Sequence, residues 1–249
     1  MHFEFSNLRN LVIVAGHAVY TGTDFETPSD DKNWWLQEFQ KGEPAAYIEH
    51  IEAGVAEASQ DEASLLVFSG GQTRAEAGPK SEALSYWQIA DVKDWFCYDS
   101  VKQRATTEEY ARDSLENLLF SIRRFQECSG SLPQRVTVVG WSFKSERFDL
   151  HRHALGIPRS RFSYLGVNEP EDLDGAMKGE ANTIAAFKAD PLGDSSDLLF
   201  KRIQRDPFHR MAPYPLGIED LEDHFRTVDR FEFPRLAMLP VENLTEIGQ

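Results

Sequence analysis

The sequence predicts a Rossmann-like three-layer α/β/α sandwich, with a mostly parallel sheet and a C-terminal appendage. Short apolar runs rich in β-branched residues, at residues 11–15, 65–68 and 136–139, are typical of strands buried on both faces of a parallel sheet. A weaker fourth strand is predicted at residues 161–165. Because strands that alternate with helices build parallel sheets with right-handed crossovers, we expect helices on both faces of this sheet.

Three segments between the predicted strands have helical periodicity. Residues 45–58 and 81–92 place apolar side chains at helical spacing, and residues 107–127 carry the strongest apolar stripe. Thr106 followed three residues later by Glu109 matches a capping box, which predicts that the third helix begins here.

The chain is expected to form one domain with an added C-terminal segment. Its 249 residues suit a single well-packed domain. We place the Rossmann-like domain at residues 1–190 and the extension at residues 191–249, because the chain then becomes aromatic and irregular, with three prolines between residues 205 and 215. We expect the extension to pack on the domain, where it could also contact a protein partner.

Composition excludes several classes of protein. The chain has 26 Lys and Arg against 41 Asp and Glu, a formal net charge of −15, whereas nucleic-acid binding is driven by basic residues. The apolar run at residues 11–15 is too short for a membrane span or a signal peptide. Cys97 and Cys128 form no metal-binding motif or disulfide framework, so we expect a soluble, cytoplasmic protein.

Ligands of open parallel sheets bind beyond the carboxyl ends of the strands, which selects three loops. The polar and glycine residues of these loops are the candidate ligand-binding residues Gly16, His17, Ser69, Gly70, Gly71, Arg74, Ser142, Lys144 and Arg147.

The loop after the second strand is the most informative of the three. The two glycines of Ser69-Gly70-Gly71 would let backbone N–H groups converge on an anion, and Arg74 could add a bidentate charge. The loop lacks the spacing of a P-loop and of a dinucleotide-binding fingerprint, and a tight turn without a ligand is the alternative. Lys144 and Arg147 near the start of the next helix would favour an anion too, unless they are solvated.

Two further interpretations concern nucleophiles and histidines. Ser142 follows a strand and a glycine as in a nucleophile elbow, with Asp172 or Asp174 and His209 or His224 later in the chain, although a lysine occupies the last glycine position. The histidines lack metal-ligand spacing, so no metal site is predicted.

The ordered motifs resemble the YdcF/SanA/ElyC-like domain, a family named for unknown function. The resemblance covers about residues 10 to 160, in the order of the motifs 12–16, 69–71, 81–83, 113–117 and 136–147. Lys144 stands where the family usually has His, and the segment beyond about residue 190 is not part of the common domain.

The resemblance implies a Rossmann-like fold and a polar pocket at Gly70, Gly71, Glu82, Glu116, Asn117 and Arg147. It also implies S-adenosylmethionine as a candidate cofactor, because one soluble member is associated with it. Glu82 and Glu116 are the candidate catalytic residues for acid/base work. If the third helix begins at Thr107, Glu116 and Asn117 could be solvated; if it begins near Ser114, both could face the sheet edge.

The sequence therefore predicts a protein that binds a nucleotide-like or phosphorylated small molecule. Transfer or hydrolysis at a charged group is the chemistry such a site could support, but whether the chain is an enzyme stays open. The alternatives are a non-catalytic ligand-sensing or scaffold domain and a hydrolase that depends on Ser142.

Overall fold

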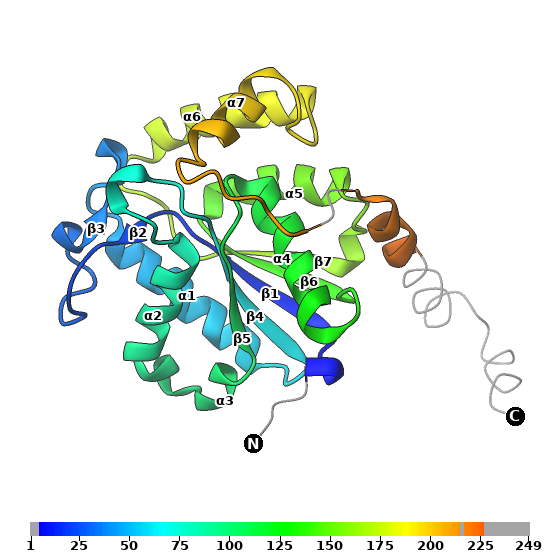
Figure 1. The fold of residues 1–249 in the computed structure, drawn as a ribbon, viewed down its shortest axis with the longest axis horizontal. Helices are drawn as coiled ribbons and strands as arrows, with labels where there is room; N and C mark the ends of the chain where they lie inside the picture. The colour runs from blue at the N-terminus through cyan, green and yellow to red at the C-terminus, as the bar shows by residue number, and fades with distance from the viewer. Residues whose placement is uncertain (1–4, 215–216, 227–249) are drawn as a thin grey trace, which may run out of the picture.

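The computed structural model describes residues 5–214 and 217–226, and it is a Rossmann-like α/β/α sandwich (Figure 1). Its central sheet has the order β5-β4-β1-β6-β7, and all four pairings are parallel. The strands of this sheet are β1 (Asn10–Ala15), β4 (Ser64–Ser69), β5 (Ala105–Glu108), β6 (Arg135–Gly140) and β7 (Phe162–Gly166). The predicted fold class is confirmed.

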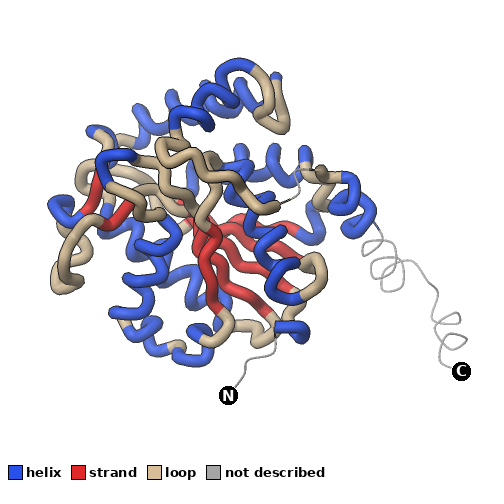
Figure 2. The backbone as a smooth tube through the Cα atoms, in the orientation of Figure 1, coloured by secondary structure: helices blue, strands red, loops and turns tan. Residues whose placement is uncertain are grey.

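Helices cover both faces of the sheet, as Figure 2 shows. On one face, α1 (Pro44–Ser59) and α2 (Glu82–Val92) share an apolar cluster with Val12 and Val14 of β1, in which α1 contacts β1 and α2 contacts β4. On the other, α4 (Ser114–Ser129) and α5 (Ser145–Ala154) share an apolar cluster with Leu11 and Ile13 of β1, in which α4 contacts β1 and α5 contacts β7. The alternation along β1 thus places one apolar cluster on each side of the sheet, which explains why its apolar run is continuous.

The smaller elements lie around this sandwich. A two-stranded antiparallel ribbon, β2 (Val19–Tyr20) with β3 (Trp34–Trp35), follows β1. Trp34 is buried in the apolar cluster of α1 and α2. The remaining helices are the short α3 (Asp99–Lys102), α6 (Leu173–Ala189) and α7 (Ser196–Gln204). Cys97 and Cys128 are both free thiols.

The third predicted helix begins later than the capping-box pattern indicates. Residues 105–108 form strand β5, which pairs with β4, so the predicted start at Thr106 is wrong. The helix begins at Ser114, and its N-cap is Asp113, whose carboxylate accepts from the backbone N–H of Glu116 at 2.9 Å. Pairing with the edge of β4 satisfies the backbone of residues 105–108 and outweighs the local capping signal.

The described part of the C-terminal extension packs on the domain. Helix α7 and the chain that follows it lie over the carboxyl ends of the strands (Figure 1), and Arg202 of α7 forms an ion pair with Asp113. Residues 219–226 are helical, and their Leu221 and Phe225 are fully buried in the cluster on the α4 face. Residues 227–249 of the predicted extension lie outside the described residues. No described helix combines the length and apolar character needed to cross a bilayer.

Candidate functional site

The strand order places the loops after β1 and β6 side by side at the centre of the sheet. The chain adds β4 and β5 on one side of β1, then returns and adds β6 and β7 on the other. Open α/β sheets bind their ligands in a crevice at the point where the strand order reverses. We call the corresponding region of this protein, at the carboxyl ends of β1 and β6, the crevice. His17 follows β1 here, and the turn Ser142–Lys144 follows β6.

Lys144 and His17 meet in this crevice. The ammonium nitrogen Nζ of Lys144 lies 3.4 Å from Nδ1 of His17, and both side chains are half-buried. Burial and the neighbouring Arg147 lower the pKa of Lys144 to about 7. Burial and Lys144 also hold the pKa of His17 well below its usual value, so this imidazole is neutral near pH 7. Its Nε2 is buried without a hydrogen-bond partner.

Three arginines from separate segments lie at the same edge as Lys144. Arg147 and Arg205 act on Lys144 directly, and Arg74 interacts with Arg205. Arg147 of α5 pairs with the buried Glu180 of α6 at 2.9 Å. Arg205, directly after α7, is close enough to lower the pKa values of Lys144, Arg147 and Arg74. Arg74 lies over the ring of Trp35, with its guanidinium carbon 4.9 Å from the ring centroid. Among the described residues, Arg74, Lys144 and Arg205 form no ion pair.

Glu82, the first residue of α2, lies between the loops that follow β1 and β4. Its Oε1 accepts from the Thr73 hydroxyl at 2.5 Å, and burial raises the pKa of its carboxyl despite the opposing hydrogen bond from Thr73 and the charge of Arg74. Glu82 packs against the backbone of two loops at once. A Cβ at Gly16 or at Gly70 would lie 2.7 Å from the Cβ of Glu82. Glycine is therefore needed at positions 16 and 70, because any larger residue would collide with the side chain of Glu82.

The predicted anion nest at Ser69-Gly70-Gly71 is not formed. The N–H of Gly70 donates to the carbonyl of Glu108 at 3.0 Å, and that of Gly71 donates to the carbonyl of Ala111 at 2.7 Å. The carbonyls of Gly71 and Gly70 accept from the first two N–H groups of α2, those of Glu82 and Ala83. Because these donors are all satisfied within the protein, charge at this edge has to come from side chains.

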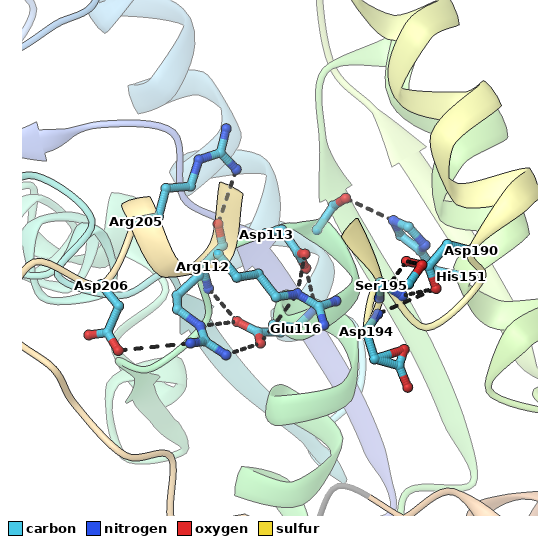
Figure 3. Close-up of polar contacts among 12 residues, drawn as sticks. Arg112, Asp113, Glu116, His151, Asp190, Asp194, Ser195, Arg205 and Asp206 are labelled. Atoms are coloured by element: carbon cyan, nitrogen blue, oxygen red, sulfur yellow. Dashed lines mark hydrogen bonds and ion pairs between the residues drawn. The ribbon is translucent and has the colours of Figure 1, made fainter. Parts of the chain in front are cut away.

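Glu116 and Asn117 face the sheet edge, as expected if the helix begins near Ser114, and both are engaged by neighbours. The carboxylate of Glu116 accepts from Arg112 through both oxygens, at 2.6 and 2.9 Å (Figure 3), and Arg202 lies 3.5 Å away. This bidentate pairing favours a structural role for Glu116. Asn117 donates to the Ser69 hydroxyl at 2.9 Å, and that hydroxyl donates to Glu108 at 2.7 Å.

The Ser142 hydrolase finds no support in the geometry. No described histidine is hydrogen-bonded to Ser142, and His224 bonds the carbonyl of Pro133 before the start of β6, at the opposite end of that strand. Asp172 caps α6 by accepting from the N–H of Gly175. In the described part of the chain, no group of three or more His, Cys, Asp or Glu side chains is arranged to hold a metal ion.

Several residues of the site could not be found from sequence motifs. Glu180 and Arg205 come from the last third of the chain, which has no recognised motif, and Glu43 precedes α1. His50 of α1 lies beside His17, with ring centroids 5.4 Å apart, and its Nε2 donates to the amide oxygen Oδ1 of Asn168 at 2.7 Å. Burial lowers the pKa of His50 to about 4, so it too is neutral near pH 7. Only the fold brings these side chains to the crevice.

Comparison with known proteins identifies a relative but no family. No protein-family model and no solved structure matches the chain. The chain is similar to an uncharacterised protein of Saccharomyces cerevisiae, YOR238W, with 27% identity over an alignment 293 residues long. The alignment covers 90% of this chain and 96% of the yeast protein. This likeness extends over nearly the whole of both proteins.

Proposed function

We propose that this protein binds a phosphorylated or nucleotide-like small molecule in the crevice at the carboxyl ends of β1 and β6. The observation that carries the proposal is the gathering of Arg74, Lys144, Arg147 and Arg205 at this edge. Among the described residues, only Arg147 of these four forms an ion pair, while Glu82 acts on Arg74 and Glu43 on Lys144 from a longer distance. Basic side chains held near one another cost free energy unless an anion compensates them. In a chain with a net charge of −15, such a local excess of positive charge favours a specific anion site.

Chemistry at the bound anion is the second part of the proposal. Glu82 supplies a carboxyl group whose pKa burial raises, and His17 supplies a neutral imidazole. An acid and a base beside a charged group suit a transfer or hydrolysis reaction. S-adenosylmethionine, the cofactor that the YdcF-like resemblance implies, belongs among the ligands to test.

Calorimetric titration tests the anion site. We expect pyrophosphate or ATP to bind the wild-type protein, and Arg74→Gln and Arg205→Gln to weaken binding by about tenfold or more, or about 1.4 kcal/mol. Lys201→Gln, an exposed lysine on α7, is the matched control and should bind like the wild type. Equal affinity in all three variants would overturn the proposal. S-adenosylmethionine is titrated in parallel, since its adenosine would add contacts that pyrophosphate lacks.

A further inference from the structure

The amine of Lys144 has surroundings unlike those of the other described lysines. It extends from the turn between β6 and α5, and its Nζ lies 3.4 Å from Nδ1 of the His17 imidazole. The ring of Phe143 lies 5.5 Å from Nζ, and no described carboxylate forms an ion pair with it. By contrast, Lys32, Lys41, Lys102 and Lys188 each lie within 3.1 Å of an acidic oxygen.

This environment favours the neutral amine. Burial withdraws water from the charged form, and Arg147 and Arg205 repel it, while Glu180 and Glu43 oppose them only in part. Lysines activated in enzymes are commonly held in this way, desolvated and beside another cation. Lys144 is half-buried, so its side chain is partly shielded from bulk water while some of its surface stays exposed.

We propose that Lys144 is a nucleophilic amine that forms an imine with an aldehyde or ketone that also carries a phosphate group. The inference rests on the proposed anion site and deepens it by naming the substrate class. The arginines remain charged across the physiological range and attract the phosphate, which leaves the amine of Lys144 free to react with the carbonyl carbon.

The step balances without an oxidant or reductant. The lone pair of Nζ forms a bond to the carbonyl carbon, and the carbonyl π electrons move to oxygen, which takes up a proton. Nζ loses a proton to Nδ1 of His17, the neutral imidazole at 3.4 Å, and His17 passes that proton to the oxygen to complete the carbinolamine. The carbinolamine then loses water as the C=N bond forms, so amine and carbonyl become imine and water. His17 thus relays the proton through Nδ1, and its Nε2 forms no hydrogen bond that would hold the ring in one tautomer.

Reductive trapping tests the inference on the wild-type protein. Pyridoxal 5′-phosphate, which carries both an aldehyde and a phosphate, is added near pH 7, reduced with sodium borohydride, and mapped by peptide mass spectrometry. We expect Lys144 to be labelled at least about tenfold faster than Lys178 and Lys201, which are exposed. Labelling of Lys144 should rise between pH 6 and 8 and then level off, following its pKa of about 7, whereas the exposed lysines should keep gaining reactivity up to about pH 10.

Variants and a second probe separate this inference from the proposed function. Lys144→Arg should abolish labelling in the peptide that contains residue 144, and His17→Gln should slow it, while Lys201→Arg should leave it unchanged. If pyrophosphate binds the protein but Lys144 is labelled no faster than Lys201, the imine inference is wrong and the anion site stands. If pyridoxal without its phosphate labels Lys144 as fast as the phosphate ester does, the amine is reactive but the anion site is wrong.

Discussion

At the level of single residues, the carboxyl edge depends on the close approach of Glu82 to backbone. Its side chain lies against Gly16 and Gly70, and its hydrogen bond from Thr73 orients the carboxyl group. Farther along the edge, the buried imidazole of His151 bonds the Ser114 hydroxyl at 2.8 Å, beside the start of α4. Both side chains are titratable groups held by packing, so small changes around them should have measurable effects on stability.

Gly70→Ala should destabilise the protein by about 1 to 3 kcal/mol, because the new Cβ would lie 2.7 Å from both the Cβ and Oε2 of Glu82. Gly179→Ala is the control: it lies within α6, where an added Cβ meets nothing within 4 Å, and should stabilise by up to about 1 kcal/mol through helix propensity. Urea unfolding measures both. A Gly70→Ala protein as stable as the wild type would contradict this account of the loop.

His151 should make the protein less stable as the pH falls. Burial lowers its pKa to about 3, below the unfolded value near 6.5, so between these values the unfolded chain binds more protons and stability falls with pH. The contribution reaches about 1.4 kcal/mol per pH unit. His151→Gln should therefore flatten the stability profile between pH 6 and 4, whatever its effect at pH 7. His153→Gln, at an exposed position, should leave the slope unchanged in the same urea titrations.

At the level of elements, an ionic network ties the C-terminal extension to the start of α4. Arg202 of α7 bonds the N-cap residue Asp113 at 2.6 Å, and Asp206 lies 3.8 Å from Arg112. Arg205 donates to the carbonyl of Arg112 at 3.0 Å, as Figure 3 shows. Arg210 continues the attachment by donating to the carbonyl of Glu109 at 2.9 Å. This network fixes the segment that brings Arg205 to the crevice.

Asp113→Asn should loosen this attachment while it preserves the helix cap. Asparagine caps helices as well as aspartate does, but its neutral side chain leaves Arg202 with a weaker partner in a mostly buried position. We expect the free energy of unfolding to fall by about 2 to 4 kcal/mol, which is somewhat less than the loss of about 3 to 5 kcal/mol that is typical when a fully buried pair is broken. Amide hydrogen exchange should rise in residues 196–212. Asp197→Asn, an exposed acid on the first turn of α7, is the control, and equal exchange in both variants would contradict the role of the network.

At the level of the whole molecule, the excess of acidic residues is a global destabilising term. With a net charge of −15 and an isoelectric point near 4.9, the folded chain repels itself at neutral pH, and salt screens this repulsion. The basic crevice is a local exception within this negative field. The two scales therefore predict different responses to salt: screening should stabilise the fold and weaken the binding of anions.

Raising NaCl from 0.02 to 0.5 M, about a fivefold decrease in Debye length, should raise Tm at pH 8 by about 2 to 4 °C, which corresponds to about 1 kcal/mol. The effect should vanish near pH 5, close to the isoelectric point, which serves as the internal control. Differential scanning calorimetry at both pH values measures it. A Tm that falls with salt at pH 8 would show that local ion pairs outweigh the global repulsion.

The sequence by itself determined the layers of the fold. The runs that became β1, β4 and β6 are apolar on both faces, and only a sheet covered by helices on both sides buries such strands. Helices α1 and α2 were predicted from the helical spacing of their apolar residues, which is also a local property of the sequence. The loops at the carboxyl edge followed from topology alone, and His17 and Lys144 of those loops do lie there. Glu82, which the resemblance to YdcF-like domains implied, lies beside them.

Only the tertiary structure decided how that edge is used. Residues 105–108 are a strand because β4 offers them a partner, and the N–H groups of Gly70 and Gly71 are consumed by the neighbouring segments, which no local pattern reveals. Arg205 and Glu180 reach the crevice across long sequence separations. Periodicity and turn chemistry are local properties of a chain, whereas hydrogen-bond partners and electrostatic neighbours depend on which segments the fold brings together.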